Sequence, residues 1–221
     1  MTALRTTSAL ALACATTLIT GAAHAGVIDP PWPRGGPNTT FQYWTFSNPS
    51  NPTAPDHWDN PNGPPQMNPN GSVYLLDNPL SPVPGTGVWC VPDGGSLSFF
   101  IPNFNRQDPK EIFVAIKYSV PPAGVGVPTV TITGLDGSAG VPCGPTYTPG
   151  PTSIPGVSQI PYGFCMPTCS SFIATISFPV GIPGSVGYIE QVVFDTRCIP
   201  APGAAGLMAL AGIAAGRRRR R

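Results

Sequence analysis

Short runs in which apolar and polar residues alternate dominate the central part of the chain. In residues 112–119 every second position carries a large apolar side chain, with Ile116 in the middle of the run. A period of two places alternate side chains on one face of an extended strand. The pattern predicts a half-buried strand in which Ile116 is almost fully buried. Residues 188–195 give a second such strand, with Tyr188, Val192 and Phe194 expected on its apolar face and Val192 almost fully buried.

The same alternation recurs along the chain and predicts eight strands. They cover residues 39–46, 72–77, 87–91, 95–101, 112–119, 127–133, 172–178 and 188–195. Short strands separated by turn residues favour an all-β fold, a single antiparallel β-sandwich of the jelly-roll or Ig-like kind. The sequence Pro92-Asp93-Gly94-Gly95 has the residues of a tight turn, and it predicts a hairpin between the strands on either side.

Composition supports this fold and excludes long helices from most of the chain. Among 221 residues there are 31 prolines and 26 glycines, yet 41% of the residues are hydrophobic, which is enough for a folded core. Proline removes a backbone donor and clashes with the preceding helical turn. Residues 47–71, which are rich in Asn and Pro, and residues 134–171, which contain three cysteines, are longer than loops without structure of their own usually are. We expect each segment to be functional, stapled by disulfides or floppy.

The first 25 residues have the three parts of a secretory signal peptide. A single cation, Arg5, precedes an apolar stretch that closes with small residues at Ala23 and Ala25, the pattern of a cleavage site. We expect residues 1–25 to form a signal-peptide helix that signal peptidase removes. Gly26 is then the mature N-terminus.

The C-terminal residues 200–221 combine three features in a fixed order. Pro200-Ala201-Pro202 leads into fourteen apolar or small residues, and five arginines follow: Arg217, Arg218, Arg219, Arg220 and Arg221. Fourteen residues are fewer than the ~20 that usually span a hydrocarbon core. A short apolar helix can still engage a membrane by thinning it, with the arginines on the cytoplasmic side. We therefore expect a short C-terminal transmembrane helix that anchors the chain transiently.

This order of elements resembles the PEP-CTERM sorting signal of bacterial exported proteins, with Pro200-Ala201-Pro202 in place of Pro-Glu-Pro. The resemblance covers only residues 200–221. It implies recognition by an exosortase, a membrane protease or transpeptidase, followed by release or attachment at the cell surface. A plain C-terminal anchor and a solvated basic tail are the alternatives.

The domain between the two ends, residues 26–199, is mildly acidic. The whole chain has a net charge of +1, but six of its eleven cations lie in the ends. The domain therefore holds five cations against ten acids, a net charge of −5. Binding to nucleic acid needs a basic face. A nucleic-acid partner is not expected.

Five cysteines remain in this domain, and disulfides are the expected state in an exported chain. They are Cys90, Cys143, Cys165, Cys169 and Cys198. We expect one bridge between Cys90 and Cys198 and another from Cys143 to Cys165 or Cys169, which leaves one thiol free. Zinc binding by the three middle cysteines is the competing interpretation, but their spacing lacks a second matching pair and a nearby histidine.

Few residues supply catalytic chemistry. His57 is the one histidine of the domain, and no Gly-x-Ser-x-Gly elbow accompanies the serines that would serve as its nucleophile. Those serines are Ser72, Ser96 and Ser98. The two glutamates, Glu111 and Glu190, both fall on expected strands, whereas a glycosidase needs two acids facing one cleft. We expect a protein without catalytic activity, and a secreted hydrolase is the third interpretation.

A cluster of oxygen ligands marks one candidate binding site. Asp56, Asp59, Asn60 and Asn62 precede Gly63, and carboxylate and amide oxygens are ligands of the calcium ions that order extracellular loops. Their spacing matches no EF-hand loop. Apart from this calcium ion, we expect no cofactor.

Two tryptophans outside the expected strands mark the other candidate. Trp32 and Trp58 are candidates for stacking on sugar rings, whereas Trp44 and Trp89 lie inside expected strands. The sequence favours an exported cell-surface or extracellular-matrix protein. A carbohydrate-binding module that takes extracellular polysaccharide is the alternative on the same sandwich.

Overall fold

The computed structural model describes residues 28–48, 50–77, 87–120, 126–179 and 185–199. The expected signal-peptide helix and the C-terminal helix with its sorting motif lie outside these residues. Within the described ranges every regular element is a β-strand. The same ranges contain no helix with the length and apolar character that crossing a membrane requires.

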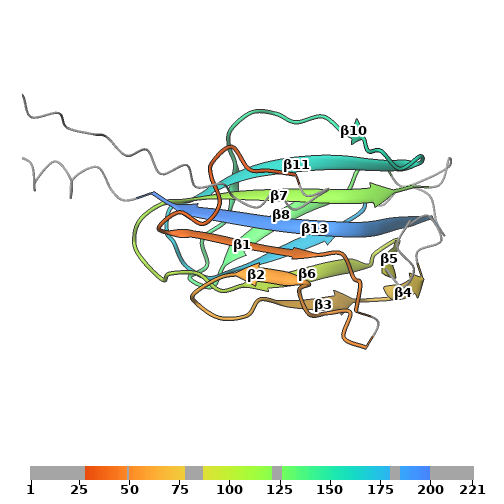
Figure 1. The fold of residues 1–221 in the computed structure, drawn as a ribbon, viewed down its shortest axis with the longest axis horizontal. Helices are drawn as coiled ribbons and strands as arrows, with labels where there is room; N and C mark the ends of the chain where they lie inside the picture. The colour runs from red at the N-terminus through yellow and green to blue at the C-terminus, as the bar shows by residue number, and fades with distance from the viewer. Residues whose placement is uncertain (1–27, 49, 78–86, 121–125, 180–184, 200–221) are drawn as a thin grey trace, which may run out of the picture.

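The strands form two antiparallel sheets (Figure 1). Their bounds are β1 Thr39–Trp44, β2 His57–Asp59, β3 Gln66–Asn70, β4 Tyr74–Asp77, β5 Gly87–Pro92, β6 Ser96–Ile101, β7 Lys110–Ser119, β8 Thr129–Gly134, β9 Val141–Pro142, β10 Gly150–Pro151, β11 Val157–Met166, β12 Phe172–Ser177 and β13 Val186–Cys198. The larger sheet has nine strands, of which six follow the order β10-β11-β7-β13-β1-β2. In addition, β5 pairs with β13 and β4, and β9 pairs with β11. The smaller sheet has the order β3-β6-β12-β8.

The apolar faces of the two sheets meet in one core. Phe194 on β13 contacts the rings of Trp44 from its own sheet and of Phe99 and Phe172 from the other, at centroid distances of 6.0, 5.2 and 6.4 Å. This contact between sheets confirms the β-sandwich. Ile116 and Val192 are both fully buried, as their positions predict.

All eight expected strands are present, and the structure adds five. Strands β2 and β3 lie in the segment 47–71, and β9, β10 and β11 lie in the segment 134–171, so neither segment is one long loop. The main omission is β11, a ten-residue strand paired with β7 along its whole length. Its apolar residues Ile160, Phe164 and Met166 do alternate along one face, but Pro161 and Gly163 lie between them, and both residue types are depleted in strands. Proline is tolerated there because β9 and β10 pair with β11 on either side of Pro161 and leave its outer edge without a partner strand.

A β-bulge in β13 changes which side chains face the core. The register with β7 shifts between Ile189 and Gln191, so Glu190 is the extra residue. Ile189 therefore joins Val192 in the core and is fully buried, whereas Tyr188 is half-buried. The prediction that Tyr188 shares the apolar face was wrong, because an uninterrupted period of two cannot represent a bulge.

The turn at residues 92–95 forms, but the hairpin does not. The Gly95 N–H donates to the carbonyl of Pro92 at 2.9 Å, and Gly94 has a φ of +75°. However, β5 belongs to the nine-stranded sheet and β6 to the four-stranded sheet. The hairpin prediction was wrong because a tight turn determines a local reversal of the chain and does not determine the pairing partner.

The disulfides are Cys143–Cys165 and Cys169–Cys198. The first is one of the two expected alternatives, and the predicted bridge from Cys90 to Cys198 was wrong. Cys90 pairs with Tyr188 near the start of β13, ten residues from Cys198, a distance of roughly 30 Å along a strand. Cys90 is a buried free thiol. The zinc interpretation was wrong as well, because all three of its cysteines are in disulfides.

Candidate functional site

The site is built on the outer face of the nine-stranded sheet, where three strands align side chains in rows. Glu111 on β7 lies between Arg197 on β13 and Cys165 on β11. In the next row, Phe113 lies between Asp195 and Gly163. Alternation along each strand turns these positions away from the core, and two chain segments then cover them.

The first cover is residues 28–34, which we call the N-terminal strap. Arg34 fastens it: Nε and Nη2 donate to the two carboxylate oxygens of Asp195 at 2.7 and 2.8 Å. The same guanidinium lies 4.0 Å from the centroid of the Phe41 ring. Burial raises the pKa of Asp195 to about 6, although the Arg34 guanidinium opposes this shift. In Figure 1 the segment before β1 passes across the long strands of this sheet. The strap brings Trp32 against Phe113, with ring centroids 6.4 Å apart.

The second cover is residues 143–149, which we call the disulfide loop. Its start is fixed on β11 by the Cys143–Cys165 bridge and by the Cys143 N–H, which donates to the carbonyl of Gly163 at 3.0 Å. A Cβ at Gly163 would lie 2.4 Å from the Cys143 carbonyl oxygen, so only glycine permits this approach. The loop places Tyr147 edge-on to Phe113, with centroids 6.2 Å apart.

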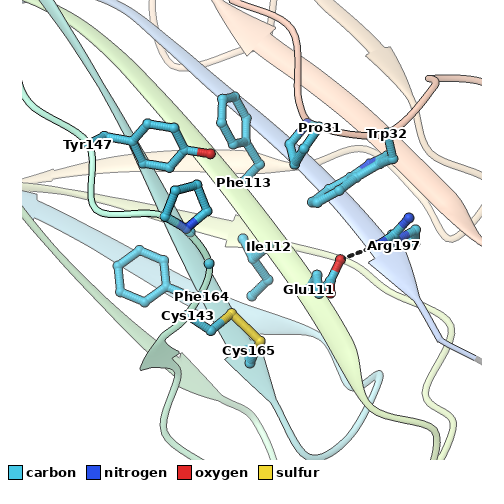
Figure 2. A pocket seen from close by; sticks show the side chains of 13 residues that line it. Pro31, Trp32, Glu111, Ile112, Phe113, Cys143, Tyr147, Phe164, Cys165 and Arg197 are labelled. Atoms are coloured by element: carbon cyan, nitrogen blue, oxygen red, sulfur yellow. Dashed lines mark hydrogen bonds and ion pairs between the residues drawn. A yellow bond between two sulfur atoms is a disulfide. The ribbon is translucent and has the colours of Figure 1, made fainter.

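A cavity of about 220 Å³ lies between the strap and the disulfide loop. Figure 2 shows Trp32 and Pro31 on one side and Tyr147 on the other, with Phe113 between them. The Cys143–Cys165 disulfide and the dashed Glu111–Arg197 contact lie below. We call this cavity the aromatic pocket.

The charged residues of the aromatic pocket are Glu111 and Arg197, which form one ion pair. Arg197 donates to the Glu111 carboxylate at 2.5 Å, and both side chains keep part of their surface in solvent. The guanidinium also lies 4.8 Å from the centroid of the Trp32 ring. Two buried donors, Trp32 Nε1 and Arg197 Nε, have no hydrogen-bond partner in the described part of the chain. Buried donors of this kind are uncommon. Neither atom is reached by solvent, so both lie behind the surface of the pocket.

A second hollow, of about 290 Å³, lies between β2 and β3. We call it the Trp58 groove. Its wall includes Trp58, which is 48% exposed on the edge strand β2, together with Gln66 and Asn68 on β3. The loop before β2 is held in place because Trp44 Nε1 donates to the Thr53 carbonyl at 3.1 Å. None of the ten residues that line the groove is ionisable.

The two tryptophans predicted to stack on sugars are therefore in different environments. Trp58 is exposed and lines the groove. Trp32 is 7% exposed, so it is a wall of the aromatic pocket and not an open platform. Trp44 and Trp89 lie on β1 and β5 and are buried, as expected.

Two of the four residues of the calcium hypothesis use their side-chain oxygens within the protein. Asp56 accepts hydrogen bonds from the backbone of Thr45 and Phe46, and Asn60 Oδ1 accepts from the backbone of Asn62 at 3.0 Å. Asp59 is exposed on the edge strand β2. Among the described residues, no group of three or more His, Cys, Asp or Glu side chains is placed to hold a metal ion.

The residues of the hydrolase hypothesis lie on opposite sides of the sandwich. His57 stacks on Tyr43, with centroids 5.7 Å apart, on the outer face of the nine-stranded sheet. Ser96 and Ser98 alternate with the buried Leu97 on β6 and therefore point out of the four-stranded sheet. Glu111 and Glu190 are both on strands, as expected.

Sequence reasoning did not identify Tyr147 or the role of Arg197. Tyr147 lies in a segment without strand periodicity, and only the Cys143–Cys165 bridge and Gly163 place it against the sheet. Arg197 lies two residues beyond the expected end of its strand. Extension of the alternation from residue 195 to 198 would have shown its outward orientation.

No protein-family model matches this chain, and no curated protein matches it. Solved structures give loose similarities. The CBM22-1 xylan-binding domain from Paenibacillus barcinonensis Xyn10C is 9% identical, over 72% of this chain and 94% of that one, with a TM-score of 0.37. The enzymatically active domain of tailspike protein 4 from bacteriophage CBA120 is 13% identical, over 67% of this chain and 20% of that one, with a TM-score of 0.30. Superpositions this loose establish neither a shared family nor a shared function.

Proposed function

We propose that this protein is an exported, non-catalytic carbohydrate-binding protein whose aromatic pocket takes a neutral sugar unit of an extracellular polysaccharide. The observation that carries the proposal is the combination in one cavity of aromatic walls and a part-exposed carboxylate–guanidinium pair. Ligand pockets are typically apolar cavities in which a few placed polar groups orient the ligand.

A sugar ring matches this combination of groups. Its C–H face packs against the rings of Trp32 and Tyr147, because aromatic side chains offer large apolar surfaces. Its hydroxyl oxygens accept from the part-exposed Arg197 guanidinium, and its hydroxyl hydrogens donate to the Glu111 carboxylate. Glu111 and Arg197 are the only charged residues of the lining, and their charges cancel, which favours a neutral sugar over an acidic one.

Export is part of the proposal. Residues 1–25 act as the signal peptide and residues 200–221 as a PEP-CTERM-like tail that an exosortase-like enzyme processes at the membrane. Two disulfides among the described residues support an oxidising destination. The protein then resides at the cell surface or in the extracellular matrix. Mass spectrometry of the isolated surface protein tests this directly. An N-terminus at Gly26 supports it, and an intact Met1 contradicts it.

A glycan array followed by titration calorimetry tests the pocket. In the double variant Glu111→Gln/Arg197→Gln, the pocket keeps its shape and neutrality but loses the carboxylate and the guanidinium. We expect binding of neutral glycans to fall at least about tenfold, which corresponds to about 1.4 kcal/mol. Arg106→Gln, at an exposed arginine that contacts Asn38, is the matched control and should bind normally. Equal binding by the double variant and the wild type would exclude the pocket as the sugar site.

A further inference from the structure

The outer face of the four-stranded sheet carries a regular array of uncharged polar side chains. The register aligns its outward positions in three rows of four. The rows are Gln66, Phe100, Ile173 and Thr133; Asn68, Ser98, Thr175 and Thr131; and Asn70, Ser96, Ser177 and Thr129. Ten of the twelve side chains are hydroxyls or amides, two are apolar, and none is ionisable. We call this array the polar face.

Hydrogen bonds within the array hold its side chains in position. Asn70 Nδ2 donates to Ser98 Oγ at 2.8 Å, and the hydroxyls of Thr129 and Ser177 are 3.2 Å apart. A hydroxyl can donate once and accept twice, so these groups keep capacity for a ligand. Because neighbouring strands are about 4.8 Å apart, the four strands present a surface roughly 14 Å wide.

The polar face and the Trp58 groove are continuous. Gln66 and Asn68 line the groove and also begin two of the three rows. Trp58, about half exposed, lies on the far side of these two amides. An extended ligand that packs against the exposed Trp58 indole at one end can therefore continue along the rows of hydroxyls.

We propose that the Trp58 groove and the polar face together bind an extended, neutral polysaccharide chain, with one sugar ring against Trp58. An occupant without charge fits because neither surface contains an ionisable side chain. A polyhydroxylated occupant fits because its hydroxyls can donate to and accept from the array at many positions. This inference rests on the proposed function, since it deepens that function by adding a second polysaccharide surface.

The polar face and the aromatic pocket lie on opposite sides of the molecule, so the protein can bind two chains where a single site would bind one. The aromatic pocket is on the outer face of the nine-stranded sheet, and the polar face is on the outer face of the other sheet. The whole thickness of the sandwich separates them. A single protein molecule therefore holds two polysaccharide chains at once and cross-links them.

The experiment measures binding of the secreted protein to soluble galactomannan and hydroxyethyl cellulose by affinity electrophoresis, with alginate as the acidic comparison. Trp58→Ala removes the indole, and Thr131→Lys puts a charge in the middle row. Each should weaken binding to at least one of the neutral polymers at least about tenfold, a loss of about 1.4 kcal/mol. Tyr74→Ala and Leu76→Lys, at exposed positions on β4 outside both surfaces, are the matched controls and should bind like the wild type.

Turbidity of protein–polymer mixtures then tests cross-linking. The wild type should precipitate the bound polymer, whereas Trp58→Ala and Glu111→Gln/Arg197→Gln should each bind it more weakly without precipitating it.

If only the pocket variant loses binding, the inference is wrong and the proposed function stands. If only the groove and face variants lose binding, the proposed pocket is wrong and cross-linking fails with it. A wild-type dimer that Thr131→Lys dissociates, together with an absence of polymer binding, would identify a self-association surface and overturn the inference.

Discussion

The two outer faces of the sandwich are built from strands of the same kind, but one is covered and the other is exposed. On the nine-stranded sheet, the outward positions include Phe41, Phe113 and Val193, which would form an apolar patch in water. The strap and the disulfide loop cover them. On the four-stranded sheet the outward positions are hydroxyls and amides, and Thr129, Thr131 and Thr133 are exposed.

The difference shows that the outward residues of a sheet determine whether it gains a further layer. Cover creates a concave site, because a strap and a loop that meet the sheet at separate places leave a cavity between them. An exposed polar sheet creates a broad surface instead. The single sugar unit of the proposed function belongs to the covered face, and the extended chain of the further inference belongs to the exposed face. The predictions below test this contrast, beginning with the largest effect.

Removal of the Cys143–Cys165 disulfide should have the largest effect. The bridge closes a loop with a sequence separation of 22, so the double variant Cys143→Ser/Cys165→Ser should lose about 3 kcal/mol of unfolding free energy in the chain-entropy account. Urea denaturation gives this value. Limited proteolysis should cut first in residues 143–149, while hydrogen exchange in β6 and β12 stays slow. First cleavage in the four-stranded sheet would contradict the assignment of this bridge to the cover.

Loss of the Arg34–Asp195 contact, which fastens the N-terminal strap, should have the second-largest effect on the free energy of unfolding. Arg34→Met leaves Asp195 buried without its partner, and the hydrogen bonds lost to a charged group correspond to about 1.5–3 kcal/mol at pH 7.5. Arg106→Met, at an exposed arginine, is the control and should change stability little.

The cost of Arg34→Met should also depend on pH. Burial already raises the pKa of Asp195 from 3.8 to about 6, so the folded state binds this proton more tightly than the unfolded state. Stability from this group therefore falls as the pH rises from about 4 to 6. Without Arg34 the pKa of Asp195 rises further, so the pH range over which stability is lost extends to higher pH. The variant should therefore lose more stability, relative to the wild type, at pH 7.5 than at pH 5. An equal loss at both values would contradict the account.

A methyl group at Gly163 should affect the pocket more than the fold. Because the added Cβ would lie 2.4 Å from the Cys143 carbonyl oxygen, Gly163→Ala must displace the disulfide loop, at about 1–3 kcal/mol. Sugar binding in the aromatic pocket should be lost. Gly150→Ala, where an added Cβ meets nothing within 4 Å, is the matched control. Titration calorimetry measures sugar binding by both variants. Normal binding by Gly163→Ala would show that the position of the disulfide loop does not affect sugar binding.

Substitution on the exposed face should change stability least. Thr131→Val replaces an exposed hydroxyl by a methyl group of similar shape, and surface changes of this kind usually stay within about 0.5 kcal/mol. Binding of neutral polymers should nevertheless weaken. A large loss of stability would show that the hydroxyl array supports the fold and is not simply a surface for a ligand.

Much of the fold could be predicted from the sequence, because alternation is a local property. It located all eight expected strands and the burial of Ile116 and Val192. Alternation does not predict which strands pair, because the partner of a strand depends on residues far away in the sequence. The predictions of a hairpin at residues 92–95 and of a Cys90–Cys198 bridge were wrong for this reason. The prediction for Tyr188 was wrong because the bulge at Glu190 interrupts the alternation.

The candidate site was predicted only in part. The tryptophans outside the expected strands marked both hollows, since Trp32 lines one and Trp58 lines the other. Sequence alone could not show that Trp32 is covered or that Tyr147 faces it. That arrangement depends on the Arg34–Asp195 pair and on the close approach of Cys143 to Gly163, and both join residues far apart along the chain.

The second disulfide has a mechanical consequence. Cys198 ends β13, the strand between β7 and β1, and the residues after Ile199 lead into the tail. A force pulling the tail along β13 loads the hydrogen bonds to both neighbours in shear, so they must break together and not one after another. The bond to Cys169 passes part of that tension covalently to the segment entering β12 in the opposite sheet. If the tail anchors the protein as proposed, the domain would therefore resist unravelling when the tail is pulled.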